Sequence, residues 1–182
     1  MERKVGGREQ KKLLIVCLGE KTEKAYFESF KTQSGHKVVV LGMGVNPSNL
    51  VAKAKGHIGH SKKNYSQVWL VFDQDQFGAD IGLAIRQAGE EGYKVALSVK
   101  QFEHWLLLHF DSYKAPLNAK DYAKKLGKHL GREYDKTLTP SDLEKLAQGR
   151  EVAIERARAM NHGDDPSTSV WELVSTLKEY CG

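Results

Sequence analysis

The amino-acid sequence predicts an α/β protein with a mainly parallel sheet, helices flanking that sheet, and a helical extension at the C-terminal end. Up to residue 100, short apolar runs rich in β-branched residues alternate with helical patterns, as in strand–helix–strand units. Beyond residue 101 the patterns are helical. The chain has 182 residues, 40% of them hydrophobic and 28% charged, which indicates a globular protein with one well-buried core.

Four apolar runs are predicted to form strands. The first, LLIVCL, is apolar throughout, as expected for a strand that is covered on both faces of a parallel sheet. The run QVWLVFDQD has the strongest strand pattern of the four. The predicted strands span residues 13–18, 36–43, 67–75 and 93–100.

Helical patterns follow the first three strands, at about residues 22–31, 46–58 and 78–91. The second of these begins with Asn46 as a capping residue and Pro47 in the first turn, where the missing N–H of proline is not needed. The third ends near Gly92. These helices are expected to connect parallel strands and to cover the sheet.

After the fourth strand, FEHWLLLHF is apolar almost all round and predicts a buried helix. The last helix is expected to open within DDPSTS, with Pro166 in its first turn. The helices of the extension are predicted at residues 119–127, 141–160 and 167–180. We therefore divide the chain into a basic flexible tail (1–12), an α/β core (13–113) and a helical extension packed on that core (114–182).

The formal net charge of +5 fits a polyanionic partner such as DNA or RNA, because basic side chains that neutralise phosphates release counterions. A solvated basic surface is the alternative explanation. The candidate nucleic-acid contacts are Lys21, Lys62, Lys63, Lys124, Lys125, Lys128 and Arg132.

No apolar run approaches the roughly 18 residues of a membrane span, and the N-terminus lacks the apolar centre of a signal peptide, so we expect a cytoplasmic protein without a membrane partner.

Acidic residues follow the predicted strands, and ligands of open parallel sheets bind beyond the carboxyl ends of the strands. Asp73 and Asp75 end the third strand, and if that strand persists their side chains leave the same face about 6–7 Å apart. Such a pair suits a hydrated Mg²⁺ or Mn²⁺ ion, which prefers oxygen ligands. The alternative is that DQDQFG is a polar turn whose aspartates cap the next helix.

Glu103 lies on an apolar stripe with Leu107 and Phe110, where a carboxylate is costly to bury unless it is paired or binds a cation. A salt bridge to a nearby Lys or Arg is the alternative to a metal. His104 and His109 lie on the same predicted helix, and packing in the core is the favoured interpretation of both, with a ligand role as the lesser alternative.

Glu20 and Glu23 stand where the first strand leads into the first helix. They either join the carboxylates at the ends of the other strands or interact with the helix dipole, which contributes about 0.3–1 kcal/mol. The sequence leaves both interpretations open.

Four segments, LIVCLGEKTEKAYF, VWLVFDQD, FEHWLLLHF and DPSTSVWELV, occur in the order and spacing typical of the RloB-like family, which the chain resembles over residues 12–178. The resemblance implies a Toprim-like catalytic domain with a helical tail, encoded near restriction-modification and other anti-phage defence genes, with a defence protein as a further possible partner. It implies a metal-dependent endonuclease that uses Mg²⁺ or Mn²⁺. By motif position, Glu23, Asp73, Asp75 and Glu103 would be the metal and acid–base residues, with Glu20 as an additional catalytic candidate.

One position departs from the family pattern CEGEKTE, because Leu18 stands where the family has its first glutamate. Leucine neither binds a cation nor accepts a proton, so either Glu20 or Glu23 takes over or the chemistry is weakened or lost. The alternative function is therefore a catalytically impaired nucleic-acid-binding subunit of a defence complex. The least favoured possibility is a partner protein whose acidic residues only cap helices.

Overall fold

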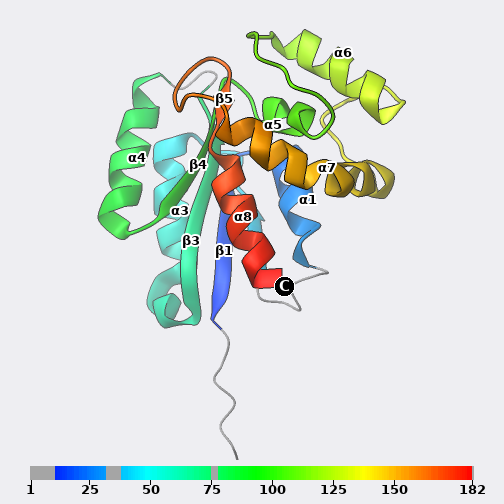
Figure 1. The fold of residues 1–182 in the computed structure, drawn as a ribbon. Coiled ribbons are helices and arrows are strands. Elements are labelled where there is room, and N and C mark those ends of the chain that lie inside the picture. The colour runs from blue at the N-terminus through cyan, green and yellow to red at the C-terminus, as the bar shows by residue number, and fades with distance from the viewer. Residues whose placement is uncertain (1–10, 32–37, 75–77, 182) are drawn as a thin grey trace, which may run out of the picture.

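A computed structural model of the chain describes residues 11–31, 38–74 and 78–181. It confirms the α/β class: five strands form one sheet in the order β2-β1-β3-β4-β5, and all neighbouring strands are parallel except β4 and β5. Figure 1 shows this sheet between its helices. The strands are β1 (Lys12–Cys17), β2 (Val38–Gly42), β3 (Tyr65–Asp73), β4 (Lys94–Val99) and β5 (Ser167–Thr168).

Strand β1 lies in the interior of the sheet, between β2 and β3. Its side chains alternate between two apolar clusters: Leu13, Ile15 and Cys17 belong to one, and Leu14 and Val16 to the other. This explains why the run is apolar throughout, since both faces of a central parallel strand are covered.

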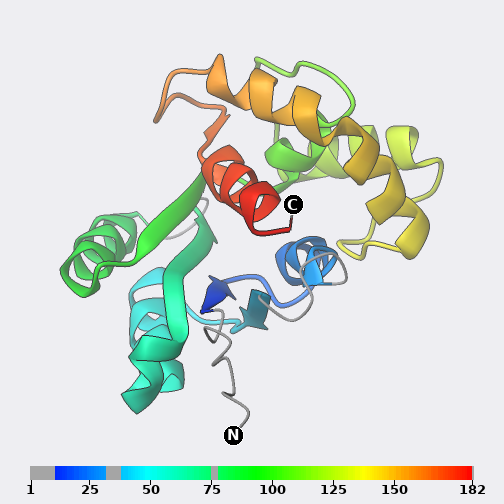
Figure 2. The same ribbon diagram turned by 60° about the horizontal axis from the view of Figure 1, so that its bottom comes forward.

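Helices α3 (Pro47–Ile58) and α4 (Ala79–Glu91) cover one face of the sheet. The predicted start and end signals are present, because the Asn46 side chain accepts a hydrogen bond from the Asn49 N–H and Gly92 ends α4 with a left-handed backbone. Figure 2 shows this helical layer on the opposite side of the sheet from the remaining helices.

The other face carries α1 (Thr22–Glu28), α5 (Glu103–Leu108) and the helices of the C-terminal part. Helix α5 is buried along its whole length, as predicted from its apolar sequence. A side chain at Gly149 would overlap with the backbone of His109, so this glycine lets α7 approach α5 closely. The C-terminal helices are α6 (Ala119–Leu130), α7 (Pro140–Arg158) and α8 (Val170–Cys181).

The prediction that the last helix begins at residue 167, with Pro166 in its first turn, is wrong. Ser167 and Thr168 instead form β5, which pairs antiparallel with β4, and α8 begins at Val170. Without β5 the backbone groups of β4 on this side would form an open sheet edge. The Thr168 and Ser98 hydroxyls lie 2.9 Å apart, and the Ser169 N–H donates to the Leu97 carbonyl at 2.8 Å, so edge pairing replaces the first helical turn.

The predictions for Asp75 and for the basic tail fall wholly or mostly outside the residues that the structure describes. Strand β3 ends at Asp73, and Asp75 lies outside the described residues, as does most of the basic tail at residues 1–12. Among residues 11–31, 38–74 and 78–181, no helix has the length and apolar character needed to cross a membrane.

Candidate acidic site

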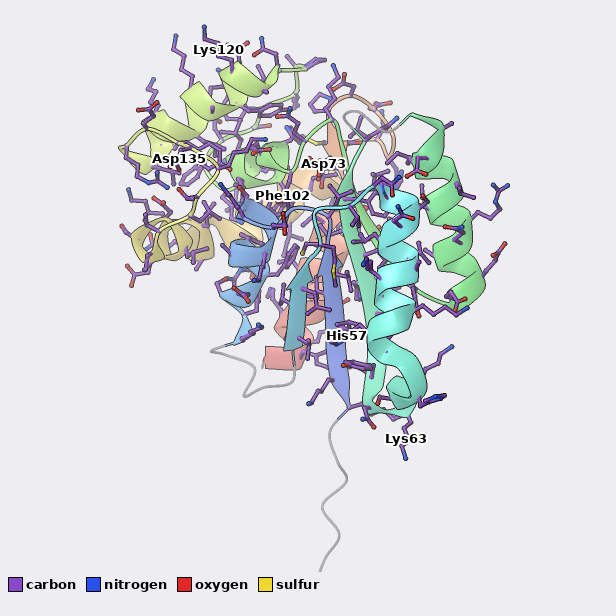
Figure 3. All side chains as sticks on the ribbon, turned by 180° about the vertical axis from the view of Figure 1, so that it is seen from behind. His57, Lys63, Asp73, Phe102, Lys120 and Asp135 are labelled. Carbon is purple, nitrogen blue, oxygen red and sulfur yellow. The ribbon has the colours of Figure 1, made fainter. Side chains whose placement is uncertain are left out.

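Asp73 is the last residue of β3 and lies on the same face of the strand as Trp69 and Val71. Its Oδ2 atom accepts a hydrogen bond from the Phe102 N–H at 3.3 Å, and Figure 3 shows the two residues close together at this end of the sheet. Its Oδ1 atom is buried and has no hydrogen-bond partner within the described part of the chain. Burial is the main reason that the pKa of Asp73 is raised well above its usual value.

Glu23 lies in the first turn of α1 and is buried. Its carboxylate lies against the backbone of Gly19, where any side chain would overlap with it. The close approach therefore requires a glycine at the end of the first strand-to-helix turn. Burial, together with the negative charge of Glu103, raises the pKa of Glu23 to about 7.

Glu103 opens α5 and is also buried. Its Oε1 atom accepts a hydrogen bond from the Tyr134 hydroxyl at 3.2 Å. Phe102, which donates to Asp73, directly precedes Glu103, and the Tyr134 hydroxyl that donates to Glu103 lies 3.0 Å from the hydroxyl of Thr22, which directly precedes Glu23. These contacts bring the carboxylates of β3, α5 and α1 into one region beyond the end of β3, and the charges of Glu23 and Glu103 both raise the pKa of Asp73. We call these three residues, Glu23, Asp73 and Glu103, the acidic site.

The acidic site contains no ion pair in the part of the chain that the structure describes. The salt bridge considered for Glu103 is therefore not found among those residues. The donor chemistry fits a hydrated divalent cation, because all the donors are oxygens and Asp73 Oδ1 is buried without a partner. The described residues nevertheless contain no group of three or more His, Cys, Asp or Glu side chains already arranged to hold a metal ion, and Asp75 is outside them.

Of the two glutamates after β1, the structure brings only Glu23 to the acidic site. Glu20 is exposed, and its carboxylate lies next to Gly44, beyond the end of β2. Its charge is not among those that act on Asp73. Of the two glutamates left open as replacements for the carboxylate missing at position 18, this arrangement favours Glu23.

Leu18 continues the pairing of β1 with β3, since its N–H donates to the Val71 carbonyl at 2.8 Å. Its side chain packs with the apolar cluster of α3 and α4, which also contains Leu14 and Val16. Asp73 lies on the opposite face with Val71. The leucine thus contributes to the core on the face of the sheet that the acidic site does not use.

A loop of residues 131–139, between α6 and α7, reaches the acidic site and was not identified from the sequence. The Thr22 hydroxyl donates to the Lys136 carbonyl at 2.7 Å and lies 3.0 Å from the Tyr134 hydroxyl, which in turn donates to Glu103. Burial and the charge of Glu103 raise the pKa of Tyr134, so this phenol stays protonated. GREYDKTLT matches no motif, so no signal in the sequence marks Tyr134 or Lys136.

Arg132, predicted to contact nucleic acid, instead holds this loop in place. Its Nε and Nη2 atoms donate to Asp142 Oδ2 at 3.0 and 2.6 Å, and the guanidinium also donates to the carbonyls of Glu133 and Thr137. With its N–H donors bound to these three residues, the Arg132 side chain is a structural brace. Its assignment as a nucleic-acid contact stays a prediction, and the contacts seen here are structural.

Replacing Arg132 with alanine is expected to lower the free energy of unfolding by about 3 kcal/mol, because the buried Asp142 carboxylate would lose its charged partner. The measurement is urea unfolding of both proteins. Lys124→Ala, at an exposed position on α6, is the control and should change stability by less than about 0.5 kcal/mol. An equal effect of the two substitutions would contradict the bracing role.

The remaining basic candidates are spread over the molecule. Lys62 and Lys63 lie in a 3₁₀ turn (Gly59–Asn64) just before β3, at the opposite end of that strand from Asp73 (Figure 3). They cannot act at the acidic site. Lys125 lies over the ring of Tyr113, with 4.9 Å between its Nζ atom and the ring centroid. The other three candidates are exposed: Lys21 directly precedes α1, and Lys124 and Lys128 lie on α6.

The histidines of α5 are core residues, as favoured from the sequence. His109 Nδ1 donates to the Trp105 carbonyl at 2.9 Å, which leaves Nε2 to accept from the Tyr26 hydroxyl at 3.1 Å. Burial lowers the pKa of His109 to about 3 and that of His104 to about 4. Both are therefore neutral at physiological pH, and neither contributes charge to the acidic site.

Comparison with known proteins gives one match. The family described as RloB-like protein matches residues 13–177 of the chain. No curated protein and no solved structure matches it significantly.

Proposed function

This chain belongs to the RloB-like protein family, and from that premise we propose that it is a Toprim-like, metal-dependent endonuclease that cleaves phosphodiester bonds of DNA or RNA at the acidic site. We further propose a role in anti-phage defence, with Mg²⁺ or Mn²⁺ as the cofactor. The family membership and the chemistry of the acidic site support this proposal together, and neither does so alone.

The observation that supports the proposal best is the gathering of two buried glutamates, Glu23 and Glu103, with the half-buried Asp73, without a cationic partner among the described residues. Burying ionised carboxylates together is unfavourable, so such a cluster either takes up protons or binds a cation. The unpartnered Asp73 Oδ1 atom is the position where a bound cation would supply the missing interaction. Structural carboxylates, by contrast, are ordinarily paired, as Asp142 is with Arg132.

Asp73, Glu23 and Glu103 would hold the ion, with Asp75 as the fourth predicted ligand. A bound Mg²⁺ or Mn²⁺ ion supplies charge that polarises the phosphodiester and stabilises the leaving oxygen. Without a cation, burial raises the pKa of Glu23 to about 7, so binding an ion near neutral pH would release its proton. Tyr134 donates to Glu103 and keeps that carboxylate oriented.

The test is cleavage of end-labelled single-stranded and duplex DNA and RNA with millimolar Mn²⁺ or with a chelator. We expect cleavage only with the metal, and a loss of on the order of 100-fold or more in Glu103→Gln, because it removes a charged ligand at the acidic site. Glu90→Gln, the same substitution at an exposed position on α4, should cleave as the wild type does. Cleavage that persists in the chelator or in Glu103→Gln would overturn the proposal.

A second candidate is a nucleic-acid-binding subunit without catalysis, and the position of Leu18 favours it. Its side chain packs with the cluster of α3 and α4, so this chain lacks a carboxylate where the family pattern has one. This candidate predicts salt-sensitive binding that a chelator leaves unchanged. Cleavage by the wild type with Mn²⁺ would overturn this second candidate, because the acidic site would then be active without a carboxylate at position 18.

A further inference from the structure

We propose that Lys136, presented by the loop of residues 131–139, contacts the phosphodiester of a nucleic acid bound at the acidic site. The inference rests on the proposed function and adds to it a positively charged residue from the C-terminal helical part of the chain.

The position of Lys136 is fixed by its backbone. Its carbonyl accepts a hydrogen bond from the Thr22 hydroxyl, and Thr22 directly precedes Glu23 in α1. Lys136 also has a positive φ of 66°, a conformation that non-glycine residues seldom adopt without support from their surroundings. The hydrogen bond to Thr22 and the brace formed by Arg132 provide that support.

The side chain of Lys136 is exposed, and no ion pair of its ammonium group exists in the part of the chain that the structure describes. It is nonetheless close enough to the acidic site that its positive charge lowers the pKa of both Glu23 and Asp73, against the larger effect of burial. The backbone of Lys136 is thus held beside Glu23 through Thr22, and its ammonium group forms no ion pair with a carboxylate in the described part of the chain.

A phosphodiester that approaches three carboxylates is repelled by their negative charge. A divalent ion offsets part of this repulsion, and a flexible ammonium group at the edge of the site can offset more by pairing with a phosphate oxygen. Lys62 and Lys63 cannot do so, because they lie at the other end of the sheet (Figure 3).

The alternative is that Lys136 serves only as a counter-ion that stabilises the carboxylates. The two roles predict different changes in Lys136→Gln. Loss of a counter-ion lowers stability and leaves nucleic-acid binding unchanged. Loss of a phosphate contact weakens nucleic-acid binding, while removal of a nearby positive charge makes binding of a divalent ion tighter.

The experiment compares the wild type, Lys136→Gln and Lys120→Ala, which removes an exposed lysine on α6 that lies away from Asp73 in Figure 3. Affinity for a labelled 30-nucleotide DNA and for the RNA of the same sequence is measured in a chelator over a series of salt concentrations. We expect Lys136→Gln to bind about tenfold more weakly at low salt, with the slope of log affinity against log salt reduced by about 1. Lys120→Ala should match the wild type.

The affinity for Mn²⁺ is measured separately, by calorimetry at pH 8.5. The rate of cleavage is measured with saturating Mn²⁺. We expect Lys136→Gln to bind Mn²⁺ about threefold more tightly and yet to cleave more slowly. If the glutamine variant is poorly folded, Lys136→Gly serves in its place, because glycine tolerates the positive φ.

The outcomes separate the two proposals. A wild type that binds and cleaves, with Lys136→Gln and Lys136→Gly equal to it in affinity and salt slope, overturns the role of Lys136 alone. A wild type that neither binds nor cleaves nucleic acid overturns the proposed function, and the role of Lys136 with it.

Discussion

Replacing Asp73 with asparagine is expected to abolish metal-dependent cleavage, by on the order of 100- to 1000-fold, and at the same time to stabilise the metal-free protein. Asparagine keeps an oxygen that can accept from the Phe102 N–H, so the local backbone contact survives. It removes the charge that Glu23 and Glu103 repel, and its NH₂ group is a donor that these carboxylates can accept from. Activity and stability should therefore change in opposite directions.

The measurements are cleavage with Mn²⁺ and the melting temperature in a chelator. A stabilisation of about 1–2 kcal/mol would raise the melting temperature by about 2–4 °C for each kcal/mol. Asp80→Asn is the matched control, because Asp80 also accepts a backbone N–H, from Ser48 at 2.9 Å, but is not part of the acidic site. It should leave cleavage unchanged and should not raise the melting temperature. If the Asp73→Asn variant still cleaves nucleic acid, the reaction does not take place at the acidic site.

The second large effect concerns Glu23→Gln, which is expected to be more stable than the wild type above pH 7. The folded protein raises the pKa of Glu23 from 4.5 to about 7, so it holds this proton more tightly than the unfolded chain does. The contribution of Glu23 to stability is present in full below pH 4.5, is lost as pH rises, and is fully lost above pH 7. Glutamine does not titrate and escapes this loss, which amounts to about 3 kcal/mol.

The measurement is chemical unfolding of both metal-free proteins between pH 4.5 and 8.5, with the difference between them plotted against pH. The difference reports Glu23 together with the effect of its charge on Asp73, because His104 and His109 destabilise both proteins alike as pH falls through the range where only the unfolded chain protonates them. Glu20→Gln, at an exposed position, should show no comparable trend. A difference that does not grow between pH 4.5 and 7 would contradict the burial of an ionised Glu23.

Much of the fold follows from local patterns. The apolar run of β1, the Asn46 cap and the apolar surface of α5 each predict their element because short-range periodicity and capping chemistry depend on neighbours in the sequence. The exception is β5, whose two residues are strand only because they complete the edge of β4. Their own sequence favours the start of a helix.

The acidic site was only partly accessible from the sequence. The rule that strand ends of a parallel sheet share one edge predicts that carboxylates after three strands lie together, among them Glu23, Asp73 and Glu103. The rule does not say which way a side chain turns after the strand ends. That is why Glu20 and Glu23 could not be distinguished, although one lies next to Gly44 and the other over Gly19.

The sequence by itself thus determined the four parallel strands, the helices that cover them, and the edge at which carboxylates gather, because these depend on periodicity and on the direction of parallel strands. Only the tertiary structure decided that Tyr134 donates to Glu103, that Lys136 is tied to Thr22 beside Glu23, and that Arg132 braces their loop. More than a hundred positions separate Thr22 from Tyr134 and Lys136. Contacts at such separation are set by how α6 and α7 pack on the core, and no pattern within a short window of residues records that packing.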